Sequence, residues 1–246
     1  MSDLIIGKNS CIEALRAGRK IRSITLLDKK ARDSSDEILK LSEKMGIPVE
    51  YADRSTMDRM AKGASHQGVI ASAEAYTYRS TDEIVAFAHQ KGEDPFLILL
   101  DGIEDPHNLG AIIRTAECAG AHGVVIPKNR SAQVNETVFK TSAGAAEHVR
   151  CARVINLSRT INQLKEQGIW IYACDMGDSQ VWDADLRGPV ALVIGSEGKG
   201  VSRLVKEKCD GIISMPMAGR VNSLNASNAA AIAMYEVVRQ RREKQP

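Results

Sequence analysis

The chain has 246 residues, a formal net charge of +2, and 43% hydrophobic and 26% charged residues, a balance typical of a soluble globular protein. It contains no run of about eighteen apolar residues, and its N-terminus lacks a basic segment followed by a long apolar stretch, so we expect neither a membrane span nor a signal peptide. The five cysteines are scattered and form no CxxC pair. This spacing favours reduced thiols in a cytoplasmic protein over a zinc site or a disulfide framework.

The first part of the chain alternates amphipathic helical runs with apolar strand-like runs. The pattern predicts a helix that starts near Ser10, with Asn9 or Ser10 as its cap, and a helix over 34–45 with Ser35 at its start. Strands are predicted at 23–27, 48–51 and 69–73. Together these elements indicate a small N-terminal α/β domain over residues 1–73.

A polar stretch, residues 74–94, interrupts this rhythm and ends in Gly92-Glu-Asp-Pro95. One helix is expected within it, over 84–90. We therefore place a linker at 74–94 and a second domain at 95–246.

From Phe96 onward, strand-like and helix-like runs alternate regularly. The predicted strands are 96–100, 123–126, 149–154, 169–174, 190–194 and 211–215. The clearest predicted helices are 109–119, 157–166, 201–208 and 226–242. Strands that alternate with helices predict a parallel sheet with helices on both faces, in which ligands bind beyond the carboxyl ends of the strands.

Three polar segments follow strands of this predicted sheet. The first, residues 101–114, contains Asn108 where a helix should begin and Arg114 among apolar neighbours. A purely structural alternative is available, with Asn108 as a helix cap and Arg114 as a surface residue. The functional alternative places both side chains at a ligand site.

The second segment, Gly195-Ser-Glu-Gly-Lys-Gly200, is a glycine-rich turn. Its spacing matches neither the dinucleotide fingerprint nor the P-loop. Glu197 disfavours a phosphate ligand and suits a cation, a sulfonium or a hydroxyl.

The third segment, residues 214–228, carries Asn222, Asn225 and Asn228. Ser223 or Asn225 could cap the last helix, whereas the three amides together indicate a network that fixes backbone and ligand.

These segments read D-G-I-x-D-P-x-N-x-G-x-I-x-R, I-G-S-E-G-x-G and S-M-P-M-x-x-x-x-N-S-L-N-A-S. In order and spacing they resemble the three signature motifs of the SpoU/TrmH family of RNA ribose 2′-O-methyltransferases, over roughly residues 95–242. G-K-N-S-x-x-E-A-L and S-H-Q-G-V-I-A, near the two ends of the first domain, resemble the substrate-binding domain of a subset of this family. That subset includes enzymes that methylate a guanosine of large-subunit (23S) ribosomal RNA.

The resemblance implies an α/β catalytic domain with a C-terminal trefoil knot, which general topology rules would not predict. It implies S-adenosylmethionine as cofactor, no metal, and a homodimer. Matched by motif position, the catalytic or near-catalytic groups would be Asn108, Arg114, Glu197 and Asn225. The cofactor pocket would be formed at Ile194, Gly195, Ile213, Met215, Leu224 and Asn225.

The role of Arg114 stays open at this stage. The family assigns it as the base, but a guanidinium with a pKa above about 12 stays protonated. We prefer Arg114 as a clamp on the RNA phosphate or the 2′-oxygen, which leaves the proton acceptor unassigned.

RNA is the expected partner, because DNA lacks the 2′-hydroxyl. The implied substrate is 23S rRNA, with a tRNA guanosine as the alternative. The net charge is weak support for nucleic acid, and the basic cluster Arg16, Arg19, Lys20 and Arg22 fits a solvated helix end equally well. Phosphate contacts could also come from the tail, through Arg239, Arg241, Arg242 and Lys244.

Two rival functions fit the sequence less well. A nicotinamide-dependent oxidoreductase lacks its glycine fingerprint after the first strand of the second domain. A non-catalytic RNA-binding protein would have no need of four polar groups placed at three strand ends.

Overall fold

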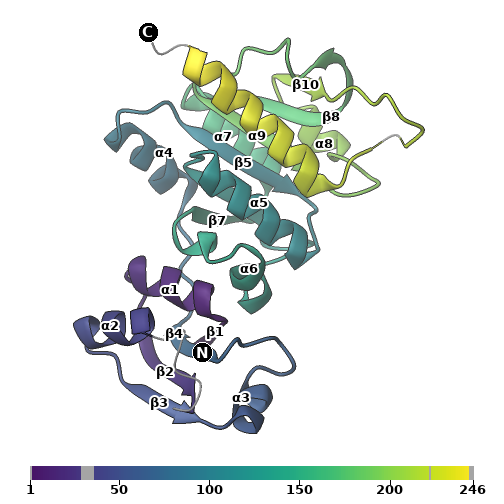
Figure 1. The fold of residues 1–246 in the computed structure, drawn as a ribbon. Helices are drawn as coiled ribbons and strands as arrows, with labels where there is room; N and C mark the ends of the chain where they lie inside the picture. The colour runs from purple at the N-terminus through teal and green to yellow at the C-terminus, as the bar shows by residue number, and fades with distance from the viewer. Residues whose placement is uncertain (1, 29–35, 222, 244–246) are drawn as a thin grey trace. The chain divides into compact units, whose positions relative to one another are not determined.

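The computed structural model describes residues 2–28, 36–221 and 223–243 (Figure 1). The chain divides into two compact units. The first comprises Met1–Thr77 and Val134–His148, and the second comprises Tyr78–Gln133 and Val149–Pro246. Over the part of the chain that is described, no helix has the length and apolar character needed to cross a membrane.

The first unit contains a four-stranded sheet in the order β1-β4-β2-β3. Its strands are β1 (Ser2–Ile6), β2 (Ile21–Leu27), β3 (Val49–Ala52) and β4 (Val69–Glu74). Strand β4 pairs antiparallel with β1 and β2, and β2 pairs parallel with β3. The three predicted strands of this region are confirmed, and β1 was not predicted.

Among the helices described, α1 (Lys8–Arg16), α2 (Asp36–Met45) and α3 (Arg54–Met60) pack against this sheet. Buried residues of α1 and α2 pack in one cluster, and Met57 of α3 packs in another. The predicted cap of α1 is wrong, because the helix starts after Gly7, whose φ of 101° suits glycine. The predicted start of α2 at Ser34 and Ser35 lies outside the described residues.

Residues 134–148, which the sequence places between two strands of the second unit, belong structurally to the first. They form α6 (Glu136–Thr141) and a 3₁₀ helix (Ala145–Glu147). Arg19 joins this segment to β1, with its guanidinium 2.6 Å from Glu147 Oε1 and 2.7 Å from Asp3 Oδ2.

The basic cluster in this unit is therefore largely neutralised by carboxylates. Arg16 pairs with Glu13 and Glu37, in addition to the two ion pairs of Arg19. This favours the structural alternative for these two arginines over RNA binding.

The second unit contains a six-stranded sheet in the order β10-β8-β9-β5-β6-β7, and all five neighbouring pairs are parallel. The strands are β5 (Phe96–Asp101), β6 (Gly123–Pro127), β7 (Arg150–Val154), β8 (Trp170–Gln180), β9 (Val190–Gly195) and β10 (Gly211–Ser214). The predicted parallel α/β sheet is confirmed. Strand β8 runs six residues beyond its predicted end at residue 174.

The helices of this unit are α4 (Thr81–Gln90), α5 (Pro106–Cys118), α7 (Leu157–Glu166), α8 (Arg203–Lys206) and α9 (Ala226–Glu243). Figure 1 shows α5 and α9 side by side on one face of the sheet, with α7 and α8 on the other. Strand β9 is buried along its whole length and β5 at every residue except Asp101, as expected for strands covered on two faces.

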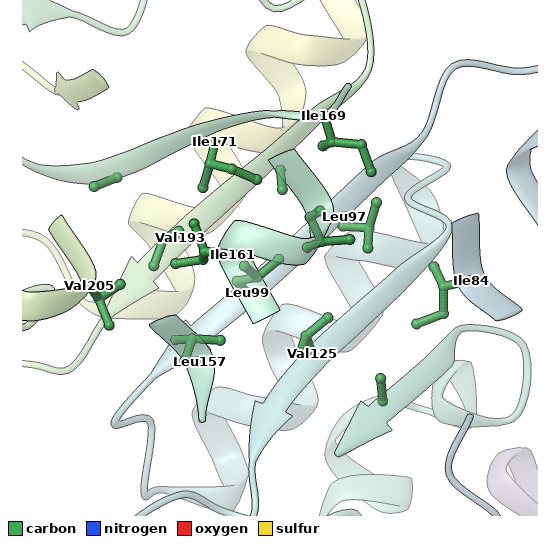
Figure 2. Packing of buried hydrophobic residues seen from close by; sticks show 14 of the residues in the cluster. Ile84, Leu97, Leu99, Val125, Leu157, Ile161, Ile169, Ile171, Val193 and Val205 are labelled. Atoms are coloured by element: carbon green, nitrogen blue, oxygen red, sulfur yellow. The ribbon is translucent and has the colours of Figure 1, made fainter. Parts of the chain in front are cut away.

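The expected linker is not a separate element in the structure. Helix α4 lies within residues 74–94, and its Ile84 and Val85 are buried in the same hydrophobic cluster as Leu97 and Ile161 (Figure 2). The helix begins with a capping box between Ser80 and Glu83. Because its apolar face is buried in the core of the second unit, α4 is part of that unit.

The strand order places a topological switch point between β5 and β9. From β5 the chain continues to β6 and β7 on one side, and β9, β8 and β10 lie on the other. Asp101 and Gly195, the last residues of β5 and β9, are register partners. Segments that leave these two strands diverge to opposite faces, which opens a crevice for a ligand.

Candidate active site

Three side chains from the three polar segments meet by hydrogen bonds beside this switch point. Nδ2 of Asn108 donates to Oε1 of Glu197 at 3.0 Å. Nδ2 of Asn225 donates to Oδ1 of Asn108 at 3.0 Å and also to Oε1 of Glu197. The structure thus brings together three of the four predicted catalytic residues.

Asn108 lies in the first turn of α5 but does not cap it. The cap is Asp105, whose Oδ1 accepts from the backbone N–H of His107 at 2.8 Å. With that role filled, the Asn108 side chain is available to Glu197 and Asn225. The capping alternative for Asn108 is therefore wrong.

Asn225 both caps α9 and belongs to the hydrogen-bond network of the site. Its Oδ1 accepts from the backbone N–H of Ser227 at 2.9 Å and of Asn228 at 3.3 Å, which caps α9. Its amide nitrogen remains free to donate to Asn108 and Glu197, and these three residues form the triad of the site. Asn228 takes part through its backbone, and Asn222 lies outside the described residues.

Glu197 uses only one carboxylate oxygen in this network. Oε1 accepts from both amides, whereas Oε2 makes no hydrogen bond with any described residue. The side chain is exposed and lines a cavity. A carboxylate with one fixed oxygen and one open oxygen can accept a proton or hydrogen bond from a ligand.

The cavity has a volume of about 280 Å³ and lies beyond the carboxyl ends of β9 and β10, beside the middle of β8. Five of the six predicted cofactor residues line it: Ile194, Gly195, Ile213, Met215 and Leu224. Asn225, the sixth, is not among the lining residues, although its neighbours Leu224 and Ala226 are.

Strand β8 contributes lining residues that lie outside the three sequence motifs. Its pairing with β10 jumps from Ala173 to Ser179, so the intervening residues bulge out of register. Cys174, Asp175 and Met176 of this bulge line the cavity. Burial raises the pKa of the Cys174 thiol to about 12, so the thiol is protonated at neutral pH.

The glycine-rich turn closes tightly on itself. The backbone N–H of Ser196 donates to the Gly200 carbonyl at 3.1 Å, and that of Gly200 donates to the Ser196 carbonyl at 2.9 Å. A Cβ on Gly195 would lie 2.0 Å from the carbonyl carbon of Gly200. Gly195 is therefore required by the close approach of two backbone segments.

Asp175 fixes the far end of this turn. Its Oδ2 accepts from the backbone N–H of Val201 at 2.9 Å and lies 3.0 Å from Lys206 Nζ. Burial tends to raise the pKa of Asp175, but these bonds outweigh it and hold that pKa below its usual value. Asp101 acts similarly at the end of β5, accepting from the backbone N–H of Ser202 at 2.7 Å. Asp101 and Asp175 directly follow the predicted strands 96–100 and 169–174, and this position was the sequence signal that could have found them.

Arg114 is not joined to the triad. It is exposed on α5, about 9 Å along the helix axis from Asn108, and makes no hydrogen bond or ion pair with the described residues. Its neighbours Ile112 and Ile113 are buried. The guanidinium is thus available to a substrate.

The cavity suits a ligand with a flat apolar part and a positive charge. Ile194, Ile213 and Leu224 offer apolar surface for a purine ring, and Glu197 at the rim favours a nearby cation such as a sulfonium. S-adenosylmethionine has both features, so the residues present fit it. In the described ranges no group of three or more His, Cys, Asp or Glu side chains could hold a metal ion.

Comparison with known proteins gives matches along almost the whole chain. Residues 95–235 match the model of the SpoU rRNA Methylase family, and residues 4–79 match that of the RNA 2′-O ribose methyltransferase substrate-binding domain. YacO of Bacillus subtilis (strain 168), which has a provisional name as a TrmH family tRNA/rRNA methyltransferase, is 48% identical over 240 residues. The match covers 97% of this chain and 96% of YacO.

Two solved structures share the architecture. The SpoU methyltransferase AviRb from Streptomyces viridochromogenes, in complex with AdoMet, has a TM-score of 0.82 at 27% identity and covers 98% of this chain and 91% of its own. The AdoMet-bound rRNA methyltransferase from Sinorhizobium meliloti has a TM-score of 0.81 at 24% identity and supports the fold alone. It covers 97% of this chain and 87% of its own.

Proposed function

The chain belongs to the SpoU rRNA methylase family, and from this premise we propose that it methylates a ribose 2′-hydroxyl of RNA with S-adenosylmethionine as donor. The observation that carries the proposal is the triad of Asn108, Glu197 and Asn225, with Glu197 on the cavity wall. RNA is the acceptor class because the 2′-hydroxyl is the group that DNA lacks.

S-adenosylmethionine, when bound, would supply the methyl group for transfer from its sulfonium sulfur to the ribose oxygen, and the electron pair of the broken carbon–sulfur bond would stay on the sulfur. The chain orients the two partners and receives the proton. The glycine turn and the side chains of Ile194, Ile213 and Leu224 would hold the donor in the cavity.

Glu197 is the proposed proton acceptor. The two amides hold Oε1, and the capped start of α9 fixes Asn225, so Oε2 keeps one position at the cavity. The hydroxyl becomes strongly acidic only as the new carbon–oxygen bond forms. A carboxylate therefore suffices to take the proton late in the reaction. The planar guanidinium of Arg114 clamps an RNA phosphate or the 2′-oxygen.

A guanosine of 23S rRNA is the proposed substrate, and the support is the match of residues 4–79 to a substrate-binding domain. A tRNA guanosine is the second candidate, because the name of the relative YacO includes both RNA classes. We place the reaction in the cytoplasm, and the first domain, residues 1–73, as the part that selects the RNA.

A trefoil knot and a homodimer complete the proposal. The knot is supported by three chain segments that close around one cavity: the bulge of β8, the glycine turn, and residues 213–224. Sedimentation of the purified full chain tests the dimer.

The function is tested by incubating the full chain with [methyl-³H]S-adenosylmethionine and total RNA from cells that lack the gene. Label should enter one RNA, and mapping of 2′-O-methylation should locate one nucleotide that is also unmodified in those cells. RNA binding without any transfer of label would overturn the proposal in favour of a non-catalytic RNA-binding protein.

A further inference from the structure

The loop after β6, residues 128–133, is held by several hydrogen bonds although it lies between secondary-structure elements. Nε2 of Gln133 donates to the backbone carbonyls of Pro127 at 2.9 Å and Ser131 at 3.1 Å. Arg130 adopts a φ of 54°, a left-handed conformation that is uncommon for a residue other than glycine. Such a conformation persists where the surroundings determine it, which here is the bonding to both sides of Arg130.

The same loop is attached to the first functional segment. The backbone carbonyl of Ile103, five residues before Asn108, accepts from the N–H of Ala132 at 2.8 Å and from the hydroxyl of Ser131 at 3.2 Å. On its other side, the N–H of Lys128 donates to the Val154 carbonyl of β7 at 2.7 Å. The loop therefore has a fixed place along the carboxyl edge of the sheet, next to the segment that carries Asn108.

Lys128 and Arg130 are exposed on this loop, and neither forms an ion pair with a described residue. Many other basic side chains of the second unit are neutralised by a carboxylate, for example Lys165 by Asp210. Two unpaired positive charges on a loop held in place by hydrogen bonds indicate a binding role. A lysine or arginine that only contacts solvent does not require a backbone with a fixed conformation.

Basic side chains continue along the edge beyond this loop. Arg153 at the end of β7 and Arg159 in the first turn of α7 are exposed and have no ion pair within the described part of the chain. Between them Ile155 is 84% exposed, which leaves an apolar side chain available to a base. The acidic Asp105 of the neighbouring loop is engaged as the cap of α5.

We propose that residues 128–130, continued by Arg153 and Arg159, form a phosphate-binding track for the RNA strand that flanks the methylated nucleotide. Arg130 is its central contact. The proposal rests on the proposed function, because the track runs along the edge where the triad would receive the target ribose. Phosphate contacts of this kind set the register of a nucleic acid without reading its sequence.

The test uses the full chain and a fluorescein-labelled single-stranded 20-nucleotide RNA of mixed sequence, without S-adenosylmethionine, at several salt concentrations. Arg130→Asn removes the charge and keeps a residue that tolerates the left-handed conformation. Arg130→Lys keeps the charge. Arg187→Asn is the matched control, because Arg187 lies before β9, at the opposite edge of the sheet, and pairs with Asp185.

We expect Arg130→Asn to weaken the Kd for RNA three- to tenfold and to reduce the slope of log K against log salt by about 0.7, the effect of one lost phosphate contact on a single strand. Arg130→Lys should retain most of the affinity, and Arg187→Asn should match the wild type. Unchanged S-adenosylmethionine binding would show that Arg130→Asn is folded.

Equal affinity and equal salt slope for Arg130→Asn and Arg187→Asn would overturn the track, even if the wild type transfers methyl groups. A selective loss of RNA affinity in Arg130→Asn would support the track. If that loss were found while the wild type transferred no methyl group to any RNA, the proposed function would fail and the RNA-binding track would stand.

Discussion

Asn108 donates a hydrogen bond to Oε1 of Glu197 at 3.0 Å, although 89 residues separate them in the sequence. The pairing of Asp101 with Gly195 at the ends of β5 and β9 makes this contact possible. Asn225, at the start of α9, donates to the same carboxylate oxygen. Because both amides donate to Oε1 of Glu197, its Oε2 remains available to a ligand. The first prediction depends on this difference between the two oxygens.

Glu197→Gln should slow methyl transfer about 100-fold or more, because the variant keeps an oxygen that can accept from both amides but loses the proton acceptor. Affinity for S-adenosylmethionine, measured by calorimetry, should fall by less than about fivefold, the weakening expected from losing one charge at the rim. Single-turnover rates on the mapped RNA check the prediction. A rate within twofold of the wild type would exclude Glu197 as the acceptor.

Gly200→Ala should weaken S-adenosylmethionine binding at least tenfold. Gly200 has a φ of 63°, and a Cβ there would lie 2.6 Å from Asp175 Oδ2, so the turn that lines the cavity would have to move. Gly92→Ala is the matched control, because Gly92 has a φ of 69° with nothing within 4 Å of the added Cβ and lies outside the cavity. Both variants should lose about 1 kcal/mol of stability from the left-handed backbone. Equal affinity of Gly200→Ala and Gly92→Ala for S-adenosylmethionine would show that the close packing of Gly200 against Asp175 does not affect the cavity.

Arg114→Ala should lower kcat/KM for RNA about 10- to 100-fold and leave S-adenosylmethionine affinity unchanged, because Arg114 is exposed and bonds to no described residue. Arg114→Lys distinguishes a planar clamp from a simple charge, since an ammonium cannot make the paired contacts of a guanidinium. We expect Arg114→Lys to stay well below the wild-type rate, with a pH–rate profile of unchanged shape. A near-normal rate in Arg114→Lys would rule out any arginine-specific role.

His122 should make folding stability sensitive to pH below about 6.5. Its Nδ1 accepts from the backbone N–H of Phe96 at 3.0 Å, and its Nε2 lies 3.0 Å from Glu93 Oε2. Burial lowers the pKa of His122, and the pairing with Glu93 opposes this only in part. The folded state therefore binds fewer protons than the unfolded state just below the usual histidine pKa of about 6.5. The contribution of His122 to the stability of the fold is therefore complete above about pH 6.5 and is lost as the pH falls below it.

Urea unfolding at pH 7.5 and pH 5.5 measures this effect, which should be at most about 1 kcal/mol. His122→Asn should lose less stability than the wild type between these two pH values. His89→Gln, at an exposed position of α4, is the control and should behave as the wild type does. An identical pH dependence in wild type and His122→Asn would refute the assignment.

The sequence alone was sufficient for the parallel sheet of the second unit. Apolar runs such as those of β5 and β9 are long enough to be buried on both faces, and helical runs separate them, so local pattern and tertiary structure agree. The predicted strand ends indicated the segments that contain Asn108, Glu197 and Asn225, and the resemblance to the family motifs selected these three residues within them.

Only the tertiary structure shows the separate role of each of these residues. Only the strand order brings the ends of β5 and β9 together, and a chain pattern carries no information on which parallel strands become neighbours. The bulge that puts Asp175 and Met176 in the cavity depends on pairing between β8 and β10, and residues 134–148 join the first unit through long-range ion pairs such as Arg19 to Glu147. The hydrophobic pattern of a segment shows whether it is buried or exposed, but it does not show which other segment it packs against. The sequence could therefore identify the triad residues, and only the fold could show that two amides share one oxygen of Glu197.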